Sequence, residues 1–409
     1  MKRPELLSPA GNLEKMRFAI LYGADAVYLS GRTFGMRSAA DNFDISELKA
    51  AVEYAHERGV RVYLTVNTMP RENEYEALKE YFRQLSDIDI DALIIADIGV
   101  LMLAKEMLPG VEIHISTQAN ATSSAACEAW YRLGAKRVVL ARELTLEEIK
   151  AIRANIPADL ELECFIHGSM CISYSGRCLL SGHIVNRDAN RGMCAQPCRW
   201  NYNIRSFEIS EEKRPDVRIP IEEINGESFI MSSRDTCTVE HIPELIEAGI
   251  SSFKIEGRMK SAYYTAVVTN TYKMAIDSYF SGKYEYNPLW YRELEAVSHR
   301  DYATGYYYSD SHLDANTQST TGYIKDKAFL AIVLSYDEKT GLALMSQRNK
   351  MKVGESAELL TPGSVGQGLE ITELYDEKGS PIDSTPHPYM NFYMKMPFAV
   401  KGGDILRGN

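Results

Sequence analysis

Short apolar runs alternate with amphipathic stretches over the first 260 residues, and this alternation limits the possible folds more than any other feature. Apolar runs of four to eight residues between turn residues are typical of buried strands, and apolar residues at helical spacing are typical of helices. Strands separated by helices lie parallel, because each helix returns the chain by a right-handed crossover. Strands are expected at Glu5–Pro9, Ala26–Ser30, Val60–Asn67, Ala92–Asp97, Glu112–Thr117, Arg137–Arg142, Leu160–His167 and Ser252–Glu256.

Eight parallel strands predict an α/β fold of the (β/α)8 TIM-barrel type, over residues 1–320. Asp44 is expected to cap the helix that follows it, and Thr145 with Glu148 forms the pattern of a capping box. Active sites of such barrels lie at the carboxyl ends of the strands. Helices are expected at Leu13–Tyr22, Ile45–Arg58, Glu74–Leu85, Ile98–Leu108, Ser123–Leu133 and Thr145–Ala154.

The pattern becomes all-β from Ala328 onward, where turn residues separate short alternating segments. We therefore predict a small C-terminal β domain, a barrel or sandwich, over residues 326–409. Its strands are expected at Phe329–Tyr336, Leu342–Gln347, Glu355–Leu360, Leu369–Tyr375 and Ala399–Leu406.

The seventh expected strand is not followed directly by its helix. Residues 168–232 intervene before a helical pattern at Val239–Ala248. An excursion of this length inside a compact domain is usually functional. Because it leaves the carboxyl end of a barrel strand, we expect it to lie at the barrel mouth.

Four of the seven cysteines lie in this insertion: Cys171, Cys178, Cys194 and Cys198. Four thiolates on one loop can hold a zinc ion or an iron–sulfur cluster. Structural zinc sites commonly use C-x2-C pairs, whereas these pairs have six and three intervening residues. Wide, uneven spacing suits the separated corners of a cube better, so we favour a 4Fe–4S cluster over zinc.

Disulfides or core thiols are a third interpretation of the cysteines. The N-terminus has no apolar leader, and no apolar run approaches the ~20 residues of a membrane span, so a cytoplasmic protein without a membrane segment is expected. Thiols stay reduced in the cytoplasm, which favours metal ligation. Cys127 and Cys164 are expected in the core, and Cys237, at the start of an expected helix, is left open as a further ligand.

Positive side chains lie at the ends of two of the expected strands: Arg142 at the end of the sixth, and Lys254 and Arg258 at the end of the eighth. Arginine binds carboxylates through two parallel hydrogen bonds and lysine adds a point charge, so these residues form a candidate anion site. The alternative is a structural belt of ion pairs with Glu143 and Glu256. His167, beside the cysteine loop, is either a donor to a cluster sulfide or a structural histidine.

Several runs resemble peptidase family U32, the collagenase-like proteases. They are ECFIHGSMC with the following GRCLLS, the opening LLSPAGNLEKMRFAILYGADAVYLS, STQAN, KIEGRMKS and HRDYATGYY. Within the family, the likeness is greatest to members that help convert the wobble uridine of tRNA to 5-hydroxyuridine. The resemblance implies a cysteine-ligated 4Fe–4S cluster, hydroxylation without molecular oxygen, tRNA as partner, and prephenate, a dicarboxylate, as co-substrate.

Two other functions remain open from the sequence. The family name implies a peptidase, but the sequence contains neither GxSxG nor HExxH, and Ser169 has no assignable histidine and aspartate partners. The other alternative is a zinc-stabilised RNA-binding module without catalysis. The net charge of −11 argues against a surface coated in basic residues, although a local basic patch is compatible with it. The sequence does not indicate an oligomeric state.

Overall fold

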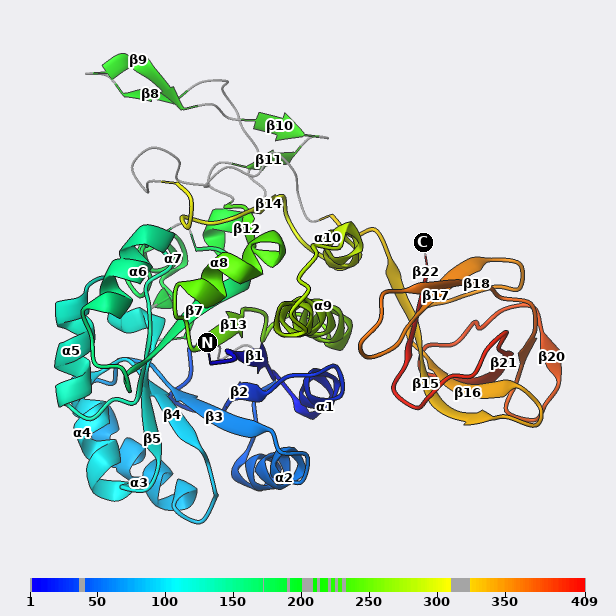
Figure 1. Ribbon diagram of the computed structural model, residues 1–409, viewed down its shortest axis with the longest axis horizontal. Helices are drawn as coiled ribbons and strands as arrows, with labels where there is room; N and C mark the ends of the chain where they lie inside the picture. Colours follow the sequence, from blue (N-terminus) through cyan, green and yellow to red (C-terminus); the bar gives the residue numbers. More distant parts are fainter. Residues whose placement is uncertain are drawn as a thin grey trace.

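The computed structural model describes residues 2–36, 41–171, 173–189, 192–200, 209–211, 214–219, 222–224, 227–229, 233–309 and 324–408. Eight parallel strands form a closed barrel, because β13 pairs with both β1 and β7 (Figure 1). The predicted (β/α)8 barrel is thus confirmed. Its strands are β1 (Glu5–Pro9), β2 (Ala26–Ser30), β3 (Arg61–Val66), β4 (Ala92–Ile95), β5 (Glu112–Ile115), β6 (Arg137–Val139), β7 (Glu161–Ser169) and β13 (Ser252–Ile255).

Helices surround the barrel (Figure 1). The two predicted N-caps are present: Asp44 and Thr145 each accept a hydrogen bond from the third helical residue, whose glutamate bonds back to the cap. Caps of this kind each contribute about 1 kcal/mol. The helices are α1 (Leu13–Leu21), α2 (Ile45–His56), α3 (Tyr75–Leu85), α4 (Ile98–Met107), α5 (Ser124–Arg132), α6 (Leu146–Ala154), α8 (Ile242–Glu247) and α9 (Ala262–Phe280).

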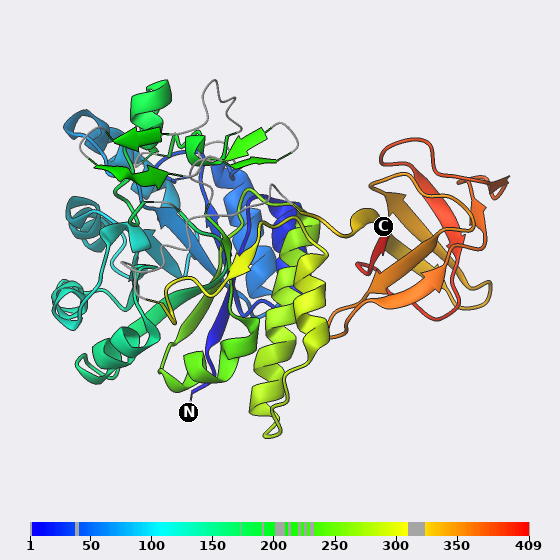
Figure 2. The ribbon, with the colours of Figure 1, turned by 90° about the horizontal axis from the view of Figure 1, so that it is seen from above.

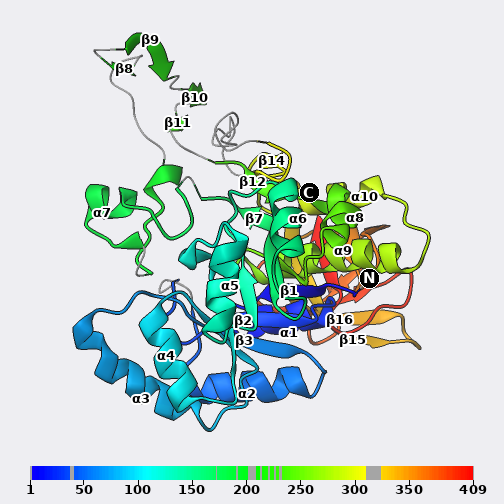
Figure 3. The same cartoon turned by 60° about the vertical axis from the view of Figure 1, so that its left-hand side comes forward.

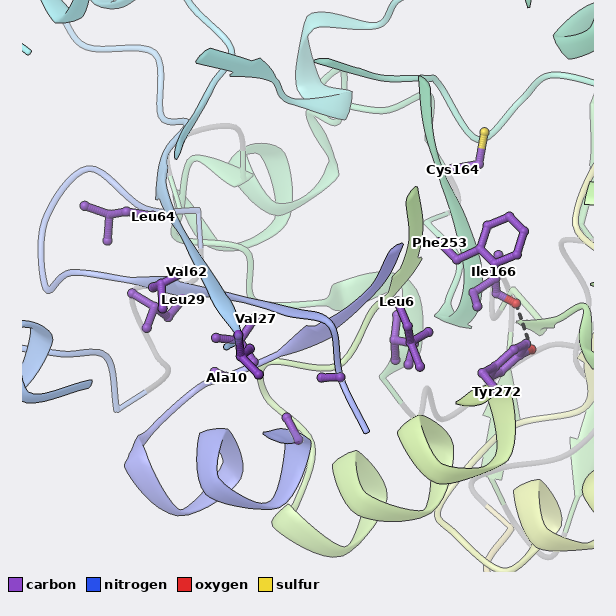
Figure 4. Packing of buried hydrophobic residues seen from close by; sticks show 14 of the residues in the cluster. Leu6, Ala10, Val27, Leu29, Val62, Leu64, Cys164, Ile166, Phe253 and Tyr272 are labelled. Carbon is purple, nitrogen blue, oxygen red and sulfur yellow. Dashed lines mark hydrogen bonds between the residues drawn. The ribbon is translucent and has the colours of Figure 1, made fainter. Parts of the chain in front are cut away.

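The main hydrophobic core lies between the strands and these helices. Leu6, Val27 and Val62 are wholly buried and belong to this layer (Figure 4). Successive residues of a strand face opposite sides, so their neighbours, including Leu7 and Tyr63, form a separate cluster. Burial of an apolar side chain contributes roughly 1.5–3 kcal/mol, which makes the outer layer the main source of barrel stability.

The insertion after β7 contains the short helix α7 (Leu180–Val185) and two hairpins. The hairpins pair β8 (Ile209–Glu211) with β9 (Arg214–Ile219), and β10 (Glu222–Ile224) with β11 (Glu227–Phe229), and they extend away from the barrel (Figure 3). Several stretches of the predicted insertion, Asn190 and Arg191 among them, lie outside the described residues.

Cys237 does not begin a helix, contrary to the prediction. It ends β12 (Asp235–Cys237), which pairs antiparallel with the end of β7 so that Cys237 lies opposite His167. Because β7 extends beyond the barrel rim, its free edge offers backbone hydrogen bonds to this segment. The predicted helix starts later, with a 3-10 turn at Val239–His241 before α8.

The C-terminal region is an antiparallel sheet beside α9 and α10 (Pro288–Glu295), as Figure 2 shows. The predicted all-β class is confirmed, but two strands were predicted wrongly: Leu369–Tyr375 is split in two, and the last strand starts only at Ile405. Residues 310–323, which include the predicted end of the barrel domain at 320, lie outside the described residues. The strands are β15 (Ala328–Asp337), β16 (Leu342–Gln347), β17 (Ser356–Leu360), β18 (Gln367–Glu370), β19 (Leu374–Tyr375), β20 (Pro381–Ile382), β21 (Asn391–Lys395) and β22 (Ile405–Gly408).

The sheet packs on the barrel helices through buried polar contacts. The hydroxyl of Tyr22, the residue after α1, donates to the Leu360 carbonyl at 3.0 Å, and Arg407 on β22 pairs with Glu293 on α10 at 2.7 Å. Among the described residues, no helix is both long and apolar enough to cross a membrane.

Candidate functional site

A cavity opens at the carboxyl ends of the barrel strands, and the three predicted cations all line it. We call it the cationic cavity. Lys254 and Arg258 are buried, whereas Arg142 is half-buried. Its lining residues are Tyr28, Met36, Thr65, Asn67, Ile94, Ser116, Thr117, Gln118, Arg142, Phe165, Lys254, Glu256 and Arg258.

Lys254 has a partner that the sequence did not suggest. Its Nζ lies 2.7 Å from Glu163 Oε1, and Glu163 Oε2 lies 3.1 Å from Arg137 Nη1. Arg137 in turn pairs with Glu5 at 2.7 Å, so a line of buried charges crosses the barrel interior. Burial would raise the pKa of Glu163, but Lys254 and Arg137 lower it below its ordinary value. Glu163 therefore stays ionised and balances much of the charge of Lys254.

Arg142 holds the start of the insertion against the barrel. Its Nη1 donates to the Ser169 carbonyl at 3.2 Å, and its guanidinium lies 5.4 Å from the centre of the Phe165 ring. The neighbouring Glu143 accepts a hydrogen bond from the Ser175 amide at 3.1 Å. Glu143 therefore binds a backbone amide of the insertion, and it does not form the ion pair with these cations that the alternative belt required.

A second cavity, the thiol cavity, is lined by all four of the cysteines singled out in the insertion. Cys171, Cys178, Cys194 and Cys198 are all half-buried. The other lining residues are Met36, Gln118, Arg142, Ser169, Tyr174, Gly176, Leu180, Ala189, Gly192, Gln196, Pro197 and Met259.

In the part of the chain that the structure describes, no three potential ligand side chains converge as on a single metal ion. The four thiols line one cavity, and four thiolates on one loop are a ligand set for either a zinc ion or an iron–sulfur cluster. The Gln196 amide lies 3.4 Å from Cys194 Sγ, and hydrogen bonds to sulfur are a means of tuning iron–sulfur clusters.

The other three cysteines line neither cavity. Cys127 and Cys164 are buried in α5 and β7, as predicted for core thiols. Burial raises the pKa of Cys127 to about 11 and that of Cys237 to about 12. Thiols in such surroundings are inert, because the thiolate is the nucleophile and the metal ligand.

His167 also lies away from both cavities. Its Nδ1 is 3.3 Å from the hydroxyl of Tyr272 on α9, and its ring lies among those of Tyr264 and Tyr302. Burial lowers its pKa to about 3. The register of β7 against β13 shifts just before His167, which helps to explain why its orientation could not be taken from simple alternation. The structural-histidine interpretation fits this position.

Two glycines place the insertion on the barrel. A Cβ on Gly176 would lie 2.6 Å from the Gln118 carbonyl oxygen, and one on Gly192 would lie 2.8 Å from the Gly35 carbonyl oxygen. Both glycines have positive φ, +72° and +88°. No other residue can approach so closely in this conformation. The cysteine segments therefore rest directly on loops that follow β5 and β2.

The two cavities adjoin, since Met36, Gln118 and Arg142 line both. Gln118 lies in the 3-10 turn that follows β5, and its local sequence does not set it apart from polar residues at other strand ends. Glu163 was missed as a site residue. The position of Glu163 between Leu162 and Cys164 in a buried strand was the available signal, because a buried carboxylate requires a partner.

Two family models together match most of the chain. Residues 11–317 match the model of peptidase family U32, and residues 325–407 match the model of its C-terminal domain. The chain belongs to peptidase family U32. This U32 protein is 37% identical to tRNA hydroxylation protein P1 of Bacillus subtilis, across 99% of this chain and 95% of the relative. It is 34% identical to tRNA hydroxylation protein P of Escherichia coli, across 97% and 94%.

The name of another relative indicates a different activity. A protein named collagenase from Porphyromonas gingivalis is 31% identical across 88% of this chain and 86% of its own length. Family membership alone therefore does not choose between RNA modification and proteolysis, and the site has to be weighed separately.

Proposed function

We propose that this protein is a tRNA-modifying enzyme that hydroxylates the wobble uridine to 5-hydroxyuridine, with prephenate as co-substrate and a 4Fe–4S cluster on Cys171, Cys178, Cys194 and Cys198. The observation that carries the proposal is the pair of adjoining cavities, one lined by four thiols and the other by three cations. Near full-length identity to two proteins named for tRNA hydroxylation supports the same reaction class.

Each cavity has a chemical role in this proposal. An iron–sulfur cluster, when bound, supplies redox-active iron beside the substrate. In the cationic cavity, Arg258 and Arg142 bind carboxylate oxygens through charge-assisted hydrogen bonds. Lys254 contributes less, because Glu163 already accepts its hydrogen bond at 2.7 Å. Lys254 and Arg258 are buried, and electrostatic attraction to a carboxylate is stronger at a buried position than in water.

Peptidase activity is the second candidate, because a relative bears the name collagenase. Ser169 does lie at the thiol cavity, and its carbonyl accepts a hydrogen bond from Arg142. Its hydroxyl has no histidine partner in the described part of the chain, and His167 lies among tyrosines instead. A serine nucleophile requires an adjacent base, so these surroundings favour the hydroxylase.

The proposal is tested by deletion and complementation. Cells lacking the protein should lose 5-hydroxyuridine and its derivatives from tRNA, measured by mass spectrometry of digested tRNA. The unsubstituted protein and Cys127→Ala should restore the modification, whereas Cys171→Ala and Cys194→Ala should not.

Metal analysis tests the cofactor separately. Protein purified without oxygen should contain iron and acid-labile sulfide, and each of the four single Cys→Ala changes at the cavity should reduce both. Stoichiometric zinc without sulfide would instead support the zinc-stabilised module. Casein or gelatin cleavage that survives iron removal and disappears in Ser169→Ala would favour the peptidase.

A further inference from the structure

A backbone amide sets the orientation of the Asn67 side chain. Asn67 is 8% exposed, and its Oδ1 accepts a hydrogen bond from the Met36 amide at 3.2 Å. A backbone N–H can only donate, so the atom facing Met36 must be the carbonyl oxygen of the side chain. Nδ2 then faces the opposite way. There it donates to Gln118 Oε1 at 2.8 Å and to Ser116 Oγ at 3.3 Å.

The same reasoning determines the orientation of the Gln118 side-chain amide. Its Oε1 accepts from Asn67 Nδ2 and also from the Ser116 hydroxyl. Both acceptor positions of the oxygen are thereby used, and the amide cannot flip without setting two donors against each other. The Nε2 group of Gln118 consequently points away from Asn67. Within the described part of the chain it makes no hydrogen bond to protein.

Arg142 lines the same two cavities as Gln118, and its guanidinium is a second source of donors there. Its Nη1 is engaged by the Ser169 carbonyl, but its buried Nε–H has no partner among the described residues. An unpaired buried donor costs about 1–3 kcal/mol, so such groups in native proteins call for an explanation. Gln118 and Arg142 line both cavities. They therefore mark the passage from one cavity to the other.

We propose that Gln118 and Arg142 form a donor pair that binds an oxygen atom of a carboxylate-bearing ligand where the cationic and thiol cavities meet, with Asn67 as the positioning residue for Gln118. The ligand extends from Arg258 toward the thiols, and the pair selects for an acceptor at that point. This inference rests on the proposed function, because it takes prephenate as the ligand. The inference goes further in naming Gln118 as the residue that requires a hydrogen-bond acceptor on the ligand where the two cavities meet.

Two substitutions at Gln118 separate a ligand contact from a structural role. Gln118→Glu keeps an oxygen that accepts from Asn67 and Ser116, but it replaces the Nε2 donors with a second carboxylate oxygen. Gln118→Met removes the donors without adding charge. Titration calorimetry with prephenate, on the full-length protein purified without oxygen, should show about tenfold weaker binding for Gln118→Met and a greater loss for Gln118→Glu.

Asn67 is tested by a double-mutant cycle. Asn67→Leu should weaken prephenate binding in the unsubstituted protein, but add little in the Gln118→Met background, because the residue it positions is then absent. The matched control is Gln84→Met on the exposed face of α3, which should bind prephenate normally. Circular dichroism checks that each variant is folded.

The possible failures can be told apart. Unchanged affinity in Gln118→Met overturns the donor pair, even if Gln118→Glu binds weakly, since a negative charge alone would explain that loss. If Asn67→Leu weakens prephenate binding by the same factor in the Gln118→Met background, the positioning role is overturned. Either result leaves the tRNA hydroxylation assay in cells positive, whereas failure of the proposed function would appear as unaltered tRNA in the deletion strain.

Discussion

Arg258 is a buried cation of the cationic cavity, and its Nη1 donates to the Thr65 hydroxyl at 3.3 Å. The other buried cation, Lys254, donates to Glu163 at 2.7 Å. We expect Arg258→Ala to weaken prephenate binding by roughly ten- to hundredfold, the equivalent of about 1.5–3 kcal/mol. Arg258→Lys should restore only part, because a point charge cannot form two parallel hydrogen bonds. Titration calorimetry measures both.

Lys378→Ala serves as the control for Arg258, because Lys378 lies in an exposed turn of the C-terminal sheet. It should bind prephenate with unchanged affinity. If Arg258→Ala also binds normally while keeping its iron, the arginine belongs to the structural framework of the barrel and the ligand lies elsewhere.

His167 makes folding stability depend on pH. Burial lowers its pKa to about 3 from the ordinary 6.5, so the folded chain holds it neutral while the unfolded chain takes up a proton below pH 6.5. Stability is therefore lost as the pH falls from about 6.5 toward 3, at up to about 1.4 kcal/mol per pH unit. His167→Gln should reduce this pH dependence between pH 7 and 5, measured by denaturant unfolding. An unchanged slope would contradict the assignment.

At the level of secondary-structure elements, the cysteine-bearing insertion is positioned by close backbone contact with the loop that follows β5. Gly176 and Gly59 have nearly equal φ, +72° and +70°, but a Cβ on Gly59 meets nothing within 4 Å. Alanine at either position pays roughly 1–2 kcal/mol for the left-handed conformation. Only Gly176→Ala also pushes the insertion away from Gln118. We expect it to lose iron and to expose its thiols to faster alkylation, whereas Gly59→Ala should behave normally in both measurements.

Most of the barrel strands could be predicted from local sequence patterns. The ends of β1 and β2 agree with the prediction to the residue, since a short apolar run between turn residues has little freedom. β12 was not predicted, because a three-residue segment has no periodicity of its own and is held by the edge of β7. The Leu369–Tyr375 error has a similar cause, since its two ends pair with different strands, β17 and β21.

Contact between the barrel and the C-terminal sheet is a property of the whole molecule. Arg407 is 2% exposed and pairs with Glu293 and Glu358 at 2.7 and 2.8 Å. Removing one partner of a buried pair costs about 3–5 kcal/mol. Arg407→Ala should therefore separate unfolding of the sheet from that of the barrel, visible as two transitions in scanning calorimetry. Glu14→Gln, which removes the half-exposed partner of Arg348, should leave the profile unchanged.

The sequence by itself determined the barrel, the position of the insertion and the grouping of four cysteines within it. Periodicity, turn residues and cysteine spacing are local properties, and they survive without knowledge of the tertiary structure. The carboxyl ends of parallel strands meet on one face by topology, so the proximity of Arg142, Lys254 and Arg258 could be expected before their contacts were known.

Only the tertiary structure decided which of these groups face each other. Lys254 meets Glu163 because β13 closes the barrel against β7, and His167 faces tyrosines because the register shifts beside it. The orientation of Gln118 follows from Asn67 and, through it, from the Met36 amide, in loops far apart in the chain. Charge balance and donor direction depend on such distant contacts, since burial and hydrogen bonding are set by what surrounds a group in space.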